Sequence, residues 1–211
     1  VELTPNCYVA AVLGTMARVD GQTKVLDWLY DHECGFGISD EICLVAADAR
    51  AVEALKWFEA HGFVKHPGHA DADDVYAGLA MSDDPTSKML MDWLNAHGYP
   101  LKDAERVADV AATRGKLVPL VWLIEHGRAP EVYGPAYFGA IRVINPRQLE
   151  WTNWTARYAI LDYLNAKGCP LVPPSSDRVL AWWSSVGSRI IEPHQGELRK
   201  RLEDAIGHAI Q

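Results

Sequence analysis

The sequence lacks the compact motifs that mark an enzyme or a metal site. Its four cysteines are scattered without a CxxC pair, so they indicate neither a disulfide framework nor a zinc site. It also contains no G-x-S-x-G motif, no G-x-G-x-x-G motif and no P-loop, the short patterns of nucleophilic catalysis and of phosphate binding. We therefore predict that the chain is not an enzyme and binds no cofactor and no metal ion.

Long apolar runs and an excess of basic charge are lacking as well. No window approaches the roughly 18 to 20 apolar residues of a membrane-spanning helix, and the N-terminus has no basic start of a secretory signal. The formal net charge is −8, which argues against a general affinity for nucleic acid or acidic lipid. We expect a soluble cytoplasmic protein without a nucleic-acid or membrane partner. A nucleic-acid site at the basic residues 199–201 is the weakest alternative.

What the chain does contain is a recurring phrase. It reads VLDWLYDHE at 25–33, ALKWFEAHG at 54–62, LMDWLNAHG at 90–98, LVWLIEHG at 120–127 and ILDYLNAKG at 160–168. The central aromatic residues are separated by 29, 36, 29 and 41 positions. A base period of 29 residues with two insertions explains these separations, and such a period is typical of repeat proteins.

Each phrase has the pattern of a helix C-terminus. Apolar residues stand at helical spacing and a glycine follows in four of the copies, because glycine readily adopts the positive φ that ends a helix. The residue before it is a histidine or a lysine, which complements the helix dipole. We expect the repeat tryptophans to pack in the core and the repeat histidines to be structural, since equivalent positions of successive repeats lie too far apart to share a metal ion. These residues are Trp28, Trp57, Trp93 and Trp122, and His32, His61, His97 and His126.

A second, shorter apolar run precedes several phrases, at 41–47, 73–80 and 104–112. These runs are rich in alanine and predict a first helix in each repeat. Asp71 and Asp103 are suitable N-caps for two of them. No alternating strand pattern of useful length occurs. The fold class predicted from the residues is therefore all-α, built from about five helix-turn-helix repeats.

Two segments carry a resemblance to a known family. AATRGKLVPLVWLIEHG at 111–127 resembles the second half of an ankyrin repeat, and AADARAVEALKWFEAHG at 46–62 is similar, with Ala51 at the position where the family places glycine or a short polar residue. The tryptophans and the Gly-x-Pro endings at 97–100 and 167–170 resemble the divergent ankyrin repeats of giant DNA viruses, amoebae and oomycetes. The resemblance implies an ankyrin-like α-solenoid, in the host cytoplasm where the source is a virus or pathogen.

The sequence also departs from the ankyrin pattern. The TPLH tetrapeptide is missing from every copy, and the period of 29 residues is shorter than the family's 33. We expect reduced hairpin loops for this reason. The predicted organisation is a single structural domain, with a repeat array over residues 1–168 and a helical C-terminal cap over residues 169–211 packed on the array.

The resemblance implies a protein-protein interaction module, a scaffold or adaptor that holds a partner or host protein on the concave repeat surface. Exposed aromatic residues near arginines are typical of binding hot spots, and the irregular C-terminal part contains several. An alternative is that these rings seal the last repeat against the cap. A different functional alternative is an enzyme or small-ligand binder with a pocket in 131–195. The candidate partner-binding residues are Tyr137, Phe138, Arg142, Trp151 and Trp154.

Overall fold

The computed structural model describes residues 6–14, 22–32, 40–64, 71–130, 134–141, 153–169, 181, 184 and 194–209. All regular secondary structure within these ranges is helical, which confirms the predicted all-α class. No helix in these ranges is both long and apolar enough to cross a membrane. The chain divides into two compact units, Val1–Leu79 with Asp84–Leu101 and Ala80–Asp83 with Lys102–Gln211. The predicted boundary between array and cap falls inside the second unit.

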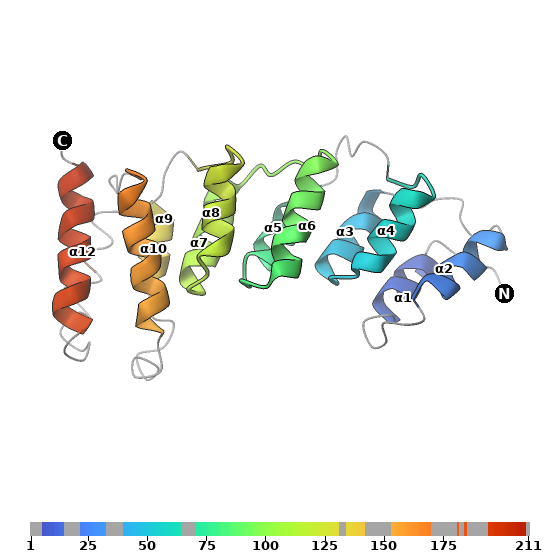
Figure 1. Ribbon diagram of the computed structural model, residues 1–211, viewed down its shortest axis with the longest axis horizontal. Coiled ribbons are helices and arrows are strands. Elements are labelled where there is room, and N and C mark those ends of the chain that lie inside the picture. The colour runs from blue at the N-terminus through green and yellow to red at the C-terminus, as the bar shows by residue number, and fades with distance from the viewer. Residues whose placement is uncertain are drawn as a thin grey trace. The chain divides into compact units, whose positions relative to one another are not determined.

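The first unit consists of three consecutive helical pairs (Figure 1). The first helices of the pairs pack on one another, α1 on α3 and α3 on α5, and the second helix α2 packs on α4. This arrangement confirms the helices predicted at 41–47 and 73–80. The pairs are α1 (Asn6–Gly14) with α2 (Gln22–Asp31), α3 (Asp40–Asp48) with α4 (Val52–Ala60), and α5 (Asp73–Leu79) with α6 (Pro85–Ala96).

Among the described residues of the second unit, helices α7 to α10 form two further pairs and α12 follows them (Figure 1). Helix α7 packs on both α8 and α9, α9 packs on α10, and α10 packs on α12. The predicted helix at 104–112 corresponds to α7, and α12 lies within the predicted helical cap over residues 169–211. The bounds are α7 (Ala104–Thr113), α8 (Val118–Glu125), α9 (Gly134–Ile141), α10 (Trp154–Ala166) and α12 (His194–Ala209).

The glycines that follow the repeated phrases end the second helices as the sequence predicts. The amide of Gly62 donates to the Glu59 carbonyl, and the next amide, that of Phe63, donates to the Phe58 carbonyl. This pair of bonds is the Schellman arrangement, which satisfies the last carbonyls of the helix. The same pattern recurs in the later copies. The left-handed φ values are +71° at Gly62, +77° at Gly98, +63° at Gly127 and +65° at Gly168.

The first helices of the second and fourth pairs end in the same way, but one of them lacks glycine. Gly115 has a φ of +70° after α7, whereas after α3 the left-handed position falls on Arg50, at +55°. Ala51 has a φ of −83°. The prediction that Ala51 replaces the family's glycine was therefore wrong by one residue, and the strained position is Arg50.

Small residues and repeat aromatics form the core of both units. Ala46, Ala47, Ala111 and Ala112 are completely buried, and their size lets neighbouring helices approach closely. Trp57 and Trp122 are buried as well, and Trp93 is half-buried. Trp28 is 50% exposed, so the expectation of core packing was wrong for this tryptophan.

Candidate interaction surface

A stacked tryptophan–histidine pair closes the second helix in each of the first four copies. The ring centroids are 3.9 Å apart for Trp57 and His61, and the interplanar angle is 20°. The Nδ1 of His61 lies 2.8 Å from the Trp57 carbonyl oxygen. Because a carbonyl oxygen only accepts, Nδ1 carries the proton and donates. The other pairs are Trp28–His32 at 4.1 Å, Trp93–His97 at 4.1 Å and Trp122–His126 at 4.5 Å, each with the same hydrogen bond.

These pairs explain why the sequence repeats both residue types at a spacing of four. Residues four apart lie on the same face of a helix, and the tryptophan carbonyl, which accepts from the backbone amide of the same histidine, has a second lone pair for its side chain. The histidine stacks on the indole and donates to the tryptophan's own carbonyl. The fifth copy keeps the spacing with different chemistry, because the Lys167 ammonium lies 5.6 Å from the centroid of the Tyr163 ring, a cation–π contact.

In the first unit, the second copy's pair is covered by helix α2 of the first copy. The indole Nε1 of Trp57 donates to the Asp27 carboxylate at 2.7 Å. The Tyr30 ring meets both members of the pair edge-on, at 5.9 Å from Trp57 and 5.0 Å from His61. One carboxylate and one aromatic ring, three residues apart on a helix, therefore contact this pair, and Phe63 stacks on Trp57 at 5.6 Å as well.

The third copy's pair is contacted in a related way by the second copy. The Glu59 carboxylate accepts from the indole Nε1 of Trp93 at 3.4 Å, and its other oxygen lies 3.5 Å from Nε2 of His97. Glu59 and Tyr30 both stand two residues after their own tryptophan. The first and second copies thus each offer an acidic or aromatic side chain to the pair that follows them.

The first copy has an equivalent face, which is largely open. Val25 and Trp28 lie on α2, and His32 follows directly after it at a spacing of four from Trp28; we call these three residues the α2 face. Val25 is 46% exposed and Trp28 is 50% exposed, and His32 is exposed as well. Of the six large hydrophobic residues that are exposed in the described chain, four lie on α1 and α2: Leu13, Val25, Trp28 and Tyr30.

Sequence analysis missed this face, although a signal was present. The first copy departs from the later ones, because Glu33 stands where they have glycine. A repeat position predicts burial only where a neighbouring element covers it.

Two of the predicted partner-binding residues are buried, contrary to the exposure expected of them. Tyr137 on α9 is fully buried; its hydroxyl lies 2.7 Å from Asn165 Oδ1 and 3.0 Å from the Cys169 carbonyl oxygen, both of which can accept its proton. Burial raises the pKa of Tyr137 well above its ordinary value, and Cys169 adds to the rise. This tyrosine joins α9 to the end of α10 and is unavailable to a partner.

Trp154, at the start of α10, is only 5% exposed. Its ring stacks with His194 of α12 at a centroid distance of 5.8 Å, which favours the alternative that this ring seals the last pair against the final helix. Phe138 is half-buried. Arg142 and Trp151, the remaining candidates, lie outside the described residues.

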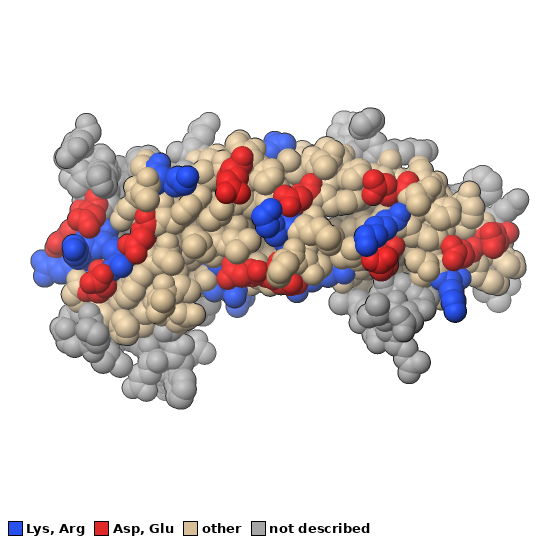
Figure 2. Space-filling view, viewed as in Figure 1, with Lys and Arg blue, Asp and Glu red and all other residues tan. Residues whose placement is uncertain are grey.

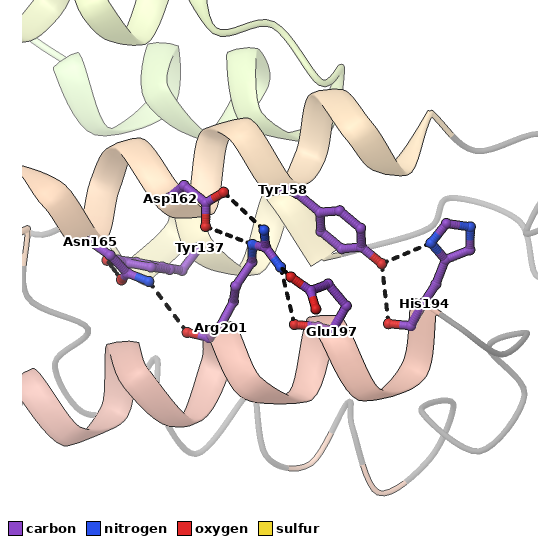
Figure 3. A network of polar contacts seen from close by, with 7 residues as sticks. All are labelled: Tyr137, Tyr158, Asp162, Asn165, His194, Glu197 and Arg201. Carbon is purple, nitrogen blue, oxygen red and sulfur yellow. Dashed lines mark hydrogen bonds and ion pairs between the residues drawn. The ribbon is translucent and has the colours of Figure 1, made fainter.

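Polar contacts join α10 to α12 around these aromatic rings (Figure 3). The hydroxyl of Tyr158 lies 3.0 Å from Nδ1 of His194 and donates to the His194 carbonyl at 3.1 Å. Burial raises the pKa of Tyr158 to about 12, with a lowering contribution from Arg201 and a raising one from Glu197. The Arg201 guanidinium lies 4.6 Å above the Tyr158 ring and pairs with both Asp162 and Glu197. The network holds two helices together and leaves its polar groups occupied.

A second buried polar centre lies where α7, α9 and α10 meet. Arg157 of α10 donates to the carbonyls of Gly139 at 3.1 Å, Ala140 at 2.7 Å and Thr113 at 3.0 Å. These carbonyls belong to the last turns of α9 and α7, where intrahelical partners are lacking and a cation is favoured. A Cβ atom at Gly139 would lie 2.9 Å from the Asp109 carbonyl oxygen, so glycine permits this close packing.

The Arg157 site supports structure and offers no reactive group. Burial lowers the pKa of the guanidinium, but arginine remains charged in proteins. Within the described ranges, no three histidine, cysteine or acidic side chains are placed to hold a metal ion. On the face drawn in Figure 2, acidic and basic side chains stand interspersed.

Comparison with known proteins identifies no relative: no family model, no curated protein and no solved structure matches the chain.

Proposed function

We propose that the chain is a protein-binding module, a scaffold or adaptor built from ankyrin-like helical repeats. Three features support the repeat part of the proposal: the recurring phrase, the packing of successive helical pairs and the closure of four second helices by a glycine at positive φ. Binding on the concave surface of an array stays a prediction of the sequence. The described residues indicate a different surface.

The observation that carries the proposal is the exposure of two large apolar side chains, Val25 and Trp28, one turn apart on α2. Tryptophan is enriched in binding hot spots, and an exposed cluster of large apolar side chains marks an interaction site. Trp28 and Val25 are each about half exposed and lie one helical turn apart. The candidate surface therefore moves from Tyr137 and Trp154, which are buried, to helix α2.

The test compares partner binding by the intact chain and by a variant that carries Val25→Ser and Trp28→Ser. The chain is immobilised on a resin and incubated with an extract of its native cell. The retained proteins are identified by mass spectrometry. We expect a specific protein that the intact chain retains and the double variant loses. Far-UV circular dichroism must show unchanged helicity, which is expected because both side chains are half-exposed.

The matched control is a variant with Met81→Ser and Met89→Ser. These methionines are 45% and 42% exposed, so the control removes a similar apolar surface from other parts of the chain. Retention by the control and loss by the α2 variant supports the proposed function. Equal retention by all three proteins, or no retained protein at all, contradicts it.

A further inference from the structure

The repeated pairs of the first unit show what kind of group covers a tryptophan–histidine face. In the second copy, helix α2 contributes the Asp27 carboxylate and the Tyr30 ring, and Phe63 of the second copy itself stacks on the pair from within. In the third copy, the covering group is the Glu59 carboxylate on the last turns of α4. Both cases place a carboxylate against the indole N–H, and both supply it from a helix. The chain itself therefore defines the chemistry that this kind of face accepts.

The α2 face has the same receptor groups. Trp28 and His32 stack at 4.1 Å, and His32 Nδ1 lies 2.8 Å from the Trp28 carbonyl oxygen. The corresponding Trp57 is 5% exposed when covered, whereas Trp28 is 50% exposed. The exposed side chain of Lys24, one turn before Trp28, adds a positive charge that favours an acidic group nearby.

We propose that the α2 face binds a helix of a partner protein that carries an acidic residue and, three residues later, an aromatic residue. The carboxylate accepts the indole proton of Trp28, and the aromatic ring packs edge-on against the Trp28–His32 stack. This proposal rests on the proposed function and specifies the partner's chemistry. It predicts a helix-in-groove mode of recognition, in which a few anchors at helical spacing provide most of the affinity.

The spacing of the partner residues follows from α2 itself. Asp27 and Tyr30 are three residues apart, so they lie on one face of their helix, and that face covers Trp57 and His61. A peptide with the sequence of residues 22–32, held helical by a lactam bridge away from these two side chains, is therefore a defined probe. It carries the acidic and the aromatic anchor without requiring the natural partner.

The experiment titrates this unlabelled peptide into the ¹⁵N-labelled full chain and follows the indole N–H signals. The Trp28 signal is assigned as the one that Trp28→Phe removes, and the Trp57 signal is assigned in the same way. We expect a saturable shift of the Trp28 signal and no shift of the Trp57 signal, because the Trp57 indole is already bonded to Asp27. A peptide with Asp27→Ala should bind about tenfold more weakly, since a hydrogen bond to a charged acceptor is lost.

Three results would overturn the proposal. The first is an unmoved Trp28 signal at millimolar peptide, and the second is equal affinity of the peptide with Asp27→Ala. The third is dimerisation of the chain through this face without peptide, detected by sedimentation and abolished by Trp28→Ser, since a second copy would then be the occupant. If the peptide fails but partner capture still depends on Val25 and Trp28, only the partner's chemistry is wrong. If both experiments fail, the proposed function fails with it.

Discussion

The first and fourth copies close their second helices with the same aromatic pair in very different surroundings. Trp28 stacks on His32 at 4.1 Å, and Trp122 stacks on His126 at 4.5 Å. The histidine hydrogen bonds are 2.8 and 2.9 Å long. Trp28 is nevertheless 50% exposed, while Trp122 is completely buried. Local sequence determines the stack, and neighbouring helices determine its burial.

The comparison separates the contacts formed within one helix from the burial that a neighbouring helix provides. A repeat sequence predicts both at the same position. The stack and the histidine bond involve residues four apart, so they form wherever the helix forms. Burial requires a neighbouring element that contributes complementary side chains. A buried pair should therefore contribute strongly to stability, and an exposed pair is available for binding.

The largest effect is expected from Trp122→Ala. Removal of a fully buried indole leaves a cavity in the second unit, and the free energy of unfolding should fall by about 3 to 5 kcal/mol. Urea denaturation followed by circular dichroism measures this loss. A loss below about 1 kcal/mol would show that the buried pair is no more important than an exposed one.

Arg157→Met should also destabilise the buried part of the second unit, through lost hydrogen bonds and not through a cavity. The methionine fills part of the space but leaves the carbonyls of Thr113, Gly139 and Ala140 without their donor, which should cost about 3 kcal/mol. The control is Arg199→Met in α12, since Arg199 is exposed and pairs with Glu203 on the same helix, and such pairs contribute about 0 to 1 kcal/mol. Equal losses of stability in the two variants would contradict the role assigned to Arg157.

Gly115→Ala and Arg50→Gly sharpen the comparison at the ends of the first helices. Alanine at a φ of +70° is strained, and the nearest atom to its Cβ would be Ala156 Cβ at an ordinary 3.8 Å, so the loss should reflect backbone strain alone, about 1 kcal/mol. Arg50→Gly relieves strain of the same kind and should stabilise by about 0.5 kcal/mol. Shifts in the thermal midpoint with opposite signs are the expected result. The same sign in both variants would contradict the assignment of Arg50 as the strained residue.

The smallest effect on stability is expected from Trp28→Ala. The ring is half-exposed, and a substitution at such a position should change the free energy of unfolding by about 0.5 kcal/mol. Urea denaturation beside Trp122→Ala gives the direct contrast. A loss as large as that of Trp122→Ala would show that the α2 face is covered in solution.

The sequence predicted the helices and their ends well because those features depend on local chemistry. Glycine after a helical phrase specifies the positive φ at Gly62 and Gly127, and aspartate before α7 supplies the cap, since Asp103 Oδ1 accepts from the Arg106 amide at 2.9 Å. Arg50 was missed because the glycine position was assigned to Ala51, although an alignment of 46–62 with 111–127 places Arg50 opposite Gly115.

The candidate site was predicted less well because exposure is a tertiary property. Tyr137 and Trp154 stand in an irregular stretch that resembles a surface, yet Asn165 and His194 lie against them. These partners are 28 and 40 residues away along the chain, and no periodicity connects them. For Trp28 the error was the reverse, because its repeat position predicted burial and the side chain is half-exposed.

The Arg157 centre also affects the order of folding. Most helix-end contacts join residues five or fewer positions apart, whereas the Arg157–Thr113 bond closes a chain segment of 44 residues. Chain closure of this length adds an entropic cost that local contacts do not carry. We expect the helical hairpins to gain protection from hydrogen exchange early during refolding. The amides around the junction of α7, α9 and α10 should become protected last.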